Sequence, residues 1–142
     1  MTKIVAVLVV ALLATPSSAL ATLPTNPNLV GAIRVARHYW HGNPPCGNPP
    51  ITFAAMPPQR DGEAIPSACV IVLSSAGDWP NYIDLCITIT HEWGHLVLGM
   101  TPFPASNPAD PAHSPDPYSI MYSAGPLIFA PCEADPAGRS SG

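Results

Sequence analysis

The chain has few charged side chains, and cationic ones are the scarcest. Five lysines and arginines stand against nine acidic residues in 142. The only lysine is Lys3, so the rest of the chain has four arginines for its positive charge. A chain this poor in cations does not have the electrostatic footprint of proteins that bind nucleic acids or anionic membranes. We therefore expect neither as a partner.

Long apolar runs are missing as well, apart from one near the N-terminus. Lys3 precedes the apolar run Ile4–Leu13, and Ala19-Leu20-Ala21 has the small-x-small pattern of a signal-peptidase site. The run is shorter than the roughly 20 residues that a membrane-spanning helix needs. We interpret residues 1–21 as a signal peptide, which predicts a secreted, extracellular protein.

The rest of the chain is long enough for one hydrophobic core but not for two. Residues 22–142 are therefore expected to form a single domain, without a membrane span and as a monomer. The tail from about residue 136 is rich in glycine and serine, and we predict it to be disordered.

Hydrophobic periodicity predicts a small α+β domain. Residues 27–40 repeat apolar side chains at three- and four-residue intervals, which predicts a helix capped by Asn26. Residues 51–56 and 69–74 have the β-branched character of strands, with a loop between them. A second helix is predicted from a cap at Asp78, with Pro80 in its first turn, to a stop at Gly99. A sheet this small needs helices packed on it.

The second predicted helix contains an H-E-x-x-H motif, in which His91 and His95 flank Glu92. A helix places both imidazoles on one face, where they can reach one zinc ion. A strand would separate them by about 13 Å, too far for a shared ion. The helix and metal predictions are therefore tied together. Catalytic zinc normally takes three protein ligands, so a third must come from elsewhere in the chain.

A proline-rich segment follows this helix and contains a second motif, from His113 to Tyr122. The two stretches, H-E-x-G-H-x-x-x-G and H-S-x-D-P-x-S-I-M-Y, together resemble the zinc-binding half of matrixin-type metallopeptidases of the metzincin group. The resemblance implies a reduced zincin domain, with a small twisted sheet on the two helices, followed by a Met-turn. It also implies one catalytic Zn²⁺ with ligands His91, His95 and His113, general base Glu92 and Met-turn residue Met121.

The resemblance covers roughly residues 86–122, and its spacing departs from the family pattern. His113 lies eighteen residues after His95, so Met100–Ala112 is an insertion. Asp110 and Asp116 are alternative third ligands, because carboxylates complete some zinc sites. Asp116 also suits a turn before a proline. No acidic loop indicates a calcium site.

The remaining polar aromatic and histidine side chains are weaker candidates. Tyr118 and Tyr122 follow the third histidine and are candidates for stabilising a transition-state oxyanion, although either could simply pack. His38 and His41 lie three residues apart at the end of the first predicted helix. Histidines there are typically solvated and face the negative end of the helix dipole. We interpret this second pair as solvated residues rather than metal ligands.

The four cysteines, Cys46, Cys69, Cys86 and Cys132, include no C-x-x-C pair, which disfavours a zinc–thiolate site. An even number in an exported chain predicts two disulfides, with three possible pairings. The sequence does not choose among them. We favour Cys46–Cys69 with Cys86–Cys132, which would tie the start of the second helix to the chain beyond the site.

The activity implied is that of a secreted zinc metalloendopeptidase acting on a peptide or protein substrate. Glu92 would take a proton from the attacking water and pass it to the departing amine. The substrate would lie along an exposed sheet edge, which we predict to be the strand at residues 69–74. Two alternatives remain: a secreted zinc-containing binding or inhibitory module with this fold but no turnover, and a disulfide-stapled structural protein without metal.

Overall fold

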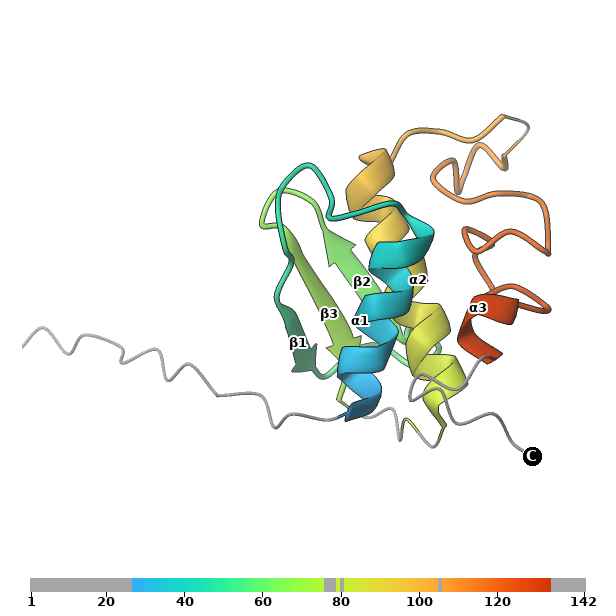
Figure 1. The fold of residues 1–142 in the computed structure, drawn as a ribbon. Helices are drawn as coiled ribbons and strands as arrows, with labels where there is room; N and C mark the ends of the chain where they lie inside the picture. Colours follow the sequence, from blue (N-terminus) through green and yellow to red (C-terminus); the bar gives the residue numbers. More distant parts are fainter. Residues whose placement is uncertain (1–26, 76–78, 80, 105, 134–142) are drawn as a thin grey trace, which may run out of the picture.

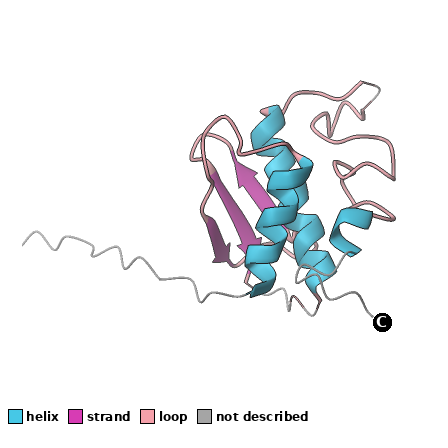
Figure 2. Cartoon of the chain, in the orientation of Figure 1, coloured by secondary structure: helices cyan, strands magenta, loops and turns pink. Residues whose placement is uncertain are grey.

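The structure is a computed structural model, and it describes residues 27–75, 79, 81–104 and 106–133. The predicted signal peptide (residues 1–21), the predicted cap Asn26 and the predicted disordered tail lie outside the described residues. Within them, the elements run in the order α1 (Pro27–Tyr39), β1 (Ile51–Ala54), β2 (Gly62–Ile65), β3 (Val70–Ser74), α2 (Tyr82–Leu98) and α3 (Ala130–Glu133). This is an α+β arrangement, as the sequence predicts (Figure 2).

The sheet is mixed and has β3 at its centre. Its order is β1-β3-β2, with β1 parallel and β2 antiparallel to β3. Two predictions are wrong here. The segment expected to be a loop contains β2, which the antiparallel pairing of Gly62 with Leu73 and of Ile65 with Val70 holds in place. In addition, β3 has a neighbour on each side, so it offers no free edge to a peptide, whereas β2 does.

The helix that carries the H-E-x-x-H motif is confirmed, but it begins later than predicted. Its N-cap is Asn81, whose side-chain oxygen accepts the backbone N–H of Asp84 at 2.8 Å. The predicted cap Asp78 is therefore wrong, and both it and Pro80 lie outside the described residues. The predicted stop is confirmed, because Gly99 is left-handed (φ 64°) and donates its N–H to the carbonyl of His95. Asparagine and aspartate are equally good caps, so composition could not choose between them.

Helix α2 is the element on which the others pack. Figure 1 shows it between α1 and the sheet on one side and the long segment after Gly99 on the other. Its side chains Ile89 and Trp93 are fully buried in the core. Two indoles join the turn after α1 to α2, because Trp40 Nε1 donates to the Thr90 carbonyl at 2.8 Å and Trp93 Nε1 donates to the Gly42 carbonyl at 3.2 Å.

Two disulfides, Cys46–Cys69 and Cys86–Cys132, close the fold in the pairing that the sequence analysis favoured. The second bond joins α2 to α3, a one-turn helix that the sequence did not predict, and both of its cysteines are buried. Disulfides are typical of proteins that fold in an oxidising compartment. Among the described residues, none of the helices combines the length and apolar character required to cross a bilayer.

Candidate metal centre

Three histidines meet beside α2. His91 and His95 lie on consecutive turns of the helix, and the segment after the helix places His113 beside them. The Nε2 atom of His91 lies 3.1 Å from that of His95 and 3.1 Å from that of His113, and the last two are 3.2 Å apart. Within the described part of the chain, this is the one group of histidine, cysteine and acidic side chains close enough to hold a metal ion together.

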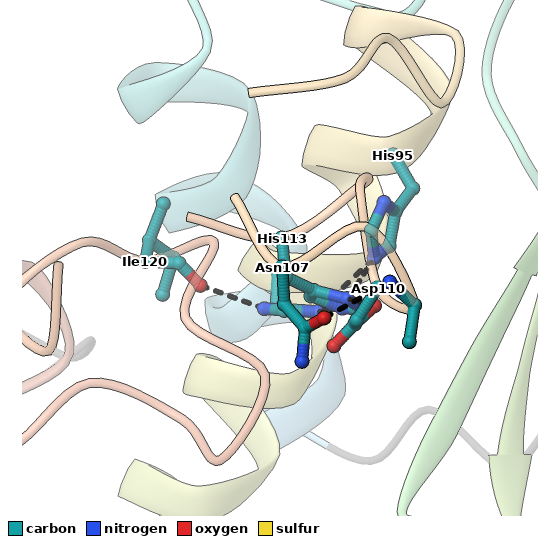
Figure 3. A network of polar contacts seen from close by, with 7 residues as sticks. His95, Asn107, Asp110, His113 and Ile120 are labelled. Atoms are coloured by element: carbon teal, nitrogen blue, oxygen red, sulfur yellow. Dashed lines mark hydrogen bonds and ion pairs between the residues drawn. The ribbon is translucent and has the colours of Figure 1, made fainter. Parts of the chain in front are cut away.

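In two of these rings, the contact made by Nδ1 determines whether Nε2 carries a proton or a lone pair. His91 Nδ1 lies 2.7 Å from the carbonyl oxygen of Ile120, and His113 Nδ1 contacts the Asp110 carboxylate (Figure 3). Each of these acceptors requires an N–H, so in the neutral rings the proton is on Nδ1 and Nε2 carries a lone pair. Two lone pairs then face each other at 3.1 Å, an arrangement that a cation between them would stabilise.

The spacing of the three nitrogens also fits a tetrahedral ion. Ligands at the usual Zn–N distance of 2.0–2.1 Å in tetrahedral geometry lie about 3.3–3.4 Å from one another. The observed separations of 3.1–3.2 Å are slightly shorter and need little adjustment. The described residues therefore form a site in which the Nε2 atoms of three neutral imidazoles could bind one metal ion.

Both alternative third ligands lie outside the triangle of nitrogens. Asp110 contacts the far nitrogen of His113, Nδ1, and not the side that faces the other histidines. Asp116 shapes the following turn, as the sequence analysis suggested, because its Oδ1 accepts the N–H of Tyr118 at 3.0 Å. Among the three candidates, the structure therefore brings His113 to the position of a third ligand.

Met121 packs against α2 at Gly94. Its side chain is 1% exposed, and a Cβ on Gly94 would overlap Met121 Sδ and lie 2.5 Å from Trp40 Cζ2. The backbone holds this turn closed, since the N–H of Ser114 donates to the Met121 carbonyl at 2.8 Å. Gly94 is a position that the sequence analysis did not single out. Its lack of a side chain allows this close approach.

We expect Gly94→Ala to lower the free energy of unfolding by about 1–2 kcal/mol, although alanine is the better helix former by about 1 kcal/mol. The added methyl has to displace Met121, which is buried in the core, or Trp40, which packs against the core. Urea unfolding measures the effect, with Ile83→Ala on the exposed side of the same helix as a control that should change little. A Gly94→Ala protein more stable than wild type would contradict the packing described here.

A cleft of about 600 Å³ opens in front of the histidines. Its walls come from β2 and the chain before it, from α2 and from residues 123–126, and Met100 also lines it. Tyr118 is 65% exposed, and neither it nor Tyr122 is among the lining residues.

The edge of β2 was missed by the sequence analysis, because Gly-Glu-Ala-Ile has little intrinsic strand preference and is held by pairing with β3.

Glu92 lines the same cleft and is only 7% exposed. Burial raises the pKa of its carboxyl to about 7, against a hydrogen bond from the Ala64 backbone that acts in the opposite direction. Gly62 allows β2 to approach the Glu92 side chain closely, since a Cβ at Gly62 would lie 3.0 Å from Glu92 Cγ. Glu92 is thus a carboxyl whose pKa lies near neutrality, in the same cleft as three imidazoles.

The pKa values of two of the imidazoles are shifted in the opposite direction. Burial lowers the pKa of His95 to about 3, helped by the neighbouring His91 and His113, and burial also lowers the pKa of His91. Both rings are therefore neutral at neutral pH, which is the form that binds metal.

These shifts give the metal-free protein a defined pH dependence. Below about pH 6.5 the unfolded chain protonates His95 and the folded chain does not, so this residue makes the free energy of unfolding fall as the pH drops towards 3. The lowered pKa of His91 acts in the same direction, and Glu92 acts in the opposite sense between about pH 4.5 and 7. We therefore expect the urea midpoint of the metal-free wild type, taken relative to that of His95→Gln, to fall from pH 6.5 to 4.5. A difference between the two proteins that does not change with pH would contradict the burial of this ring.

Fold and site together define a small α+β domain with a three-histidine centre at a cleft. Comparison of the chain with protein-family models, with curated proteins and with solved structures finds no match. The assignment of a function therefore depends on the chemistry of the site.

Proposed function

We propose that the protein is a secreted zinc-dependent endopeptidase with a reduced metzincin-type domain. The observation that carries the proposal is the triangle of Nε2 atoms at 3.1–3.2 Å, with the buried Glu92 in the same cleft. The H-E-x-x-H motif supplies two of the nitrogens and the carboxyl, and the motif that begins at His113 supplies the third.

Zinc is the metal that this donor set favours. Imidazole nitrogens suit zinc among the abundant biological cations, and three protein ligands leave the fourth tetrahedral position open, as in catalytic sites. The two disulfides support the proposal of an exported protein, because such bonds persist in oxidising compartments.

A zinc ion in such a site lowers the pKa of water to about 7 and polarises a substrate carbonyl. Glu92 takes the proton of the attacking water and delivers it to the nitrogen of the departing amine. A pKa of about 7 in the metal-free protein suits a group that both accepts and donates a proton near neutral pH. The hydrogen bonds from His91 to the Ile120 carbonyl and from His113 to Asp110 keep both rings in the tautomer that presents Nε2.

The substrate is proposed to lie along β2, in place of the β3 edge expected from the sequence. β2 is an edge strand, and Gly62, Glu63 and Ala64 line the cleft together with Glu92. A peptide added there as a further strand would form main-chain hydrogen bonds with β2 and pass in front of the histidines. Such pairing fixes the direction of the chain with little dependence on its side chains.

The proposal is tested by metal analysis and a cleavage screen on the purified protein. We expect one zinc per chain and cleavage of members of a fluorescence-quenched peptide library. Phenanthroline should abolish cleavage, and added zinc should restore it. A protein free of metal after growth with zinc, or cleavage indifferent to the chelator, would contradict the proposal. Bound zinc without any cleavage would instead favour a binding or inhibitory module.

A further inference from the structure

We propose that Asp110 is a positioning residue for the metal centre, which holds the His113 ring in place through its outer nitrogen. The inference rests on the proposed metal site. It assigns a task to the Met100–Ala112 insertion: the loop that separates the second and third histidines also supplies the carboxylate that orients the third.

The first support is the direction of the contact. The Asp110 carboxylate bonds Nδ1 of His113, while Nε2 of the same ring faces His91 and His95 (Figure 3). Asp110 therefore lies on the side of the ring opposite the centre. A carboxylate there fixes the tautomer and the rotation of the ring.

The second support is that the loop holds Asp110 in a defined turn. The N–H of Asp110 donates to the Asn107 carbonyl at 2.8 Å, and the Asn107 side chain accepts the N–H of Ala109 at 2.9 Å. A backbone hydrogen bond of 2.9 Å from Phe103 to Pro111 closes the loop around this turn. The carboxylate is thus presented by a backbone that other contacts already fix.

The third support is a difference among the three ligands. His91 and His95 are carried by a 17-residue helix, which fixes their backbone directions. His113 comes from an irregular segment, so its ring needs an external contact to stay aligned. A carboxylate is a stronger acceptor than the Ile120 carbonyl that serves His91. It also brings a negative charge close to the cation.

The test compares Asp110→Ala and Asp110→Asn with Asp116→Ala in the full protein. Asp116 is a matched control, because it lies three residues after His113 as Asp110 lies three before, and its carboxylate accepts the backbone N–H of Tyr118 in its own turn. Competition with a chromophoric chelator measures the zinc affinity. We expect about a 10–100-fold loss for Asp110→Ala. The loss should be smaller for Asp110→Asn, which keeps an oxygen acceptor, and Asp116→Ala should stay within about twofold of wild type.

A second readout does not require zinc. Nitrogen-15 NMR of the metal-free protein reports which nitrogen of His113 carries the proton. Wild type should show the Nδ1–H form, and Asp110→Ala a mixture of the two tautomers. If Asp110→Ala does not fold, the same comparison is made with Asp110→Asn.

Wild-type affinity and an unchanged tautomer in the Asp110 variants would overturn the inference. A loss as complete as that of His113→Ala would also overturn it, because Asp110 would then be acting as a ligand. If Asp110 variants bind zinc weakly and the wild type cleaves no peptide, the positioning role holds and the proposed activity fails.

Discussion

Glu92→Gln is expected to lower peptide cleavage by about 10²–10⁴-fold while leaving zinc bound. Glutamine has the same shape and can still accept the Ala64 hydrogen bond, but it cannot take a proton from water. The three nitrogens that define the metal centre belong to other residues, so the affinity for zinc should stay within a few-fold of wild type. Steady-state kinetics on one library-derived peptide, combined with metal analysis of the same sample, measures both quantities.

The matched control for this substitution is Glu133→Gln. Glu133 is an exposed glutamate in α3 and is not among the residues that line the cleft. The substitution makes the same change of side chain away from the site, so cleavage should be unchanged. A Glu92→Gln protein that cleaves as fast as this control would rule out Glu92 as the general base.

Zinc is expected to stabilise the folded protein strongly. A ligand at 100 times its dissociation constant contributes about 2.7 kcal/mol, which for a domain of this size corresponds to a rise in Tm of roughly 10–20 °C. The structural reason is that the ion would join His113 to His91 and His95 and so fasten the long segment after Gly99 to α2. Thermal unfolding with chelator and with added zinc measures the shift.

His95→Ala should abolish most of that shift, because it removes one of the three proposed ligands. His38→Ala is the matched control. His38 is an exposed histidine on α1 and belongs to no metal-binding group among the described residues, so its loss should leave the shift intact. Equal shifts in both variants would place zinc somewhere other than the three-histidine centre.

Local periodicity was enough to predict the part of the site that lies on α2. In a helix, residues four apart face the same way whatever surrounds them, so His91 and His95 could be paired from their spacing alone. The same kind of local signal located α1, β1, β3 and the stop at Gly99. These predictions depend only on the residues within each segment, which is why they required no knowledge of the fold.

Local signals failed where a neighbour in space decides the outcome. β2 is a strand because β3 lies beside it, and β3 is central because β2 pairs with its other edge. The edge that faces the cleft therefore belongs to β2, which has the weakest strand pattern in the sheet. The need for a glycine at position 94 likewise follows only from its close contacts with Met121 and Trp40.

The sequence by itself determined that the chain carries two helical histidines with a carboxyl between them, and it ranked His113 ahead of Asp110 and Asp116 as their partner. Only the tertiary structure decided that His113, eighteen residues after His95, has its Nε2 atom 3.1–3.2 Å from the Nε2 atoms of His91 and His95. The same holds for Asp110, which lies at Nδ1 on the far side of the His113 ring. The reason is physical. The path of a proline-rich loop depends on distant contacts, among them a disulfide, a closing backbone hydrogen bond and the packing of Met121, and residue spacing does not encode these.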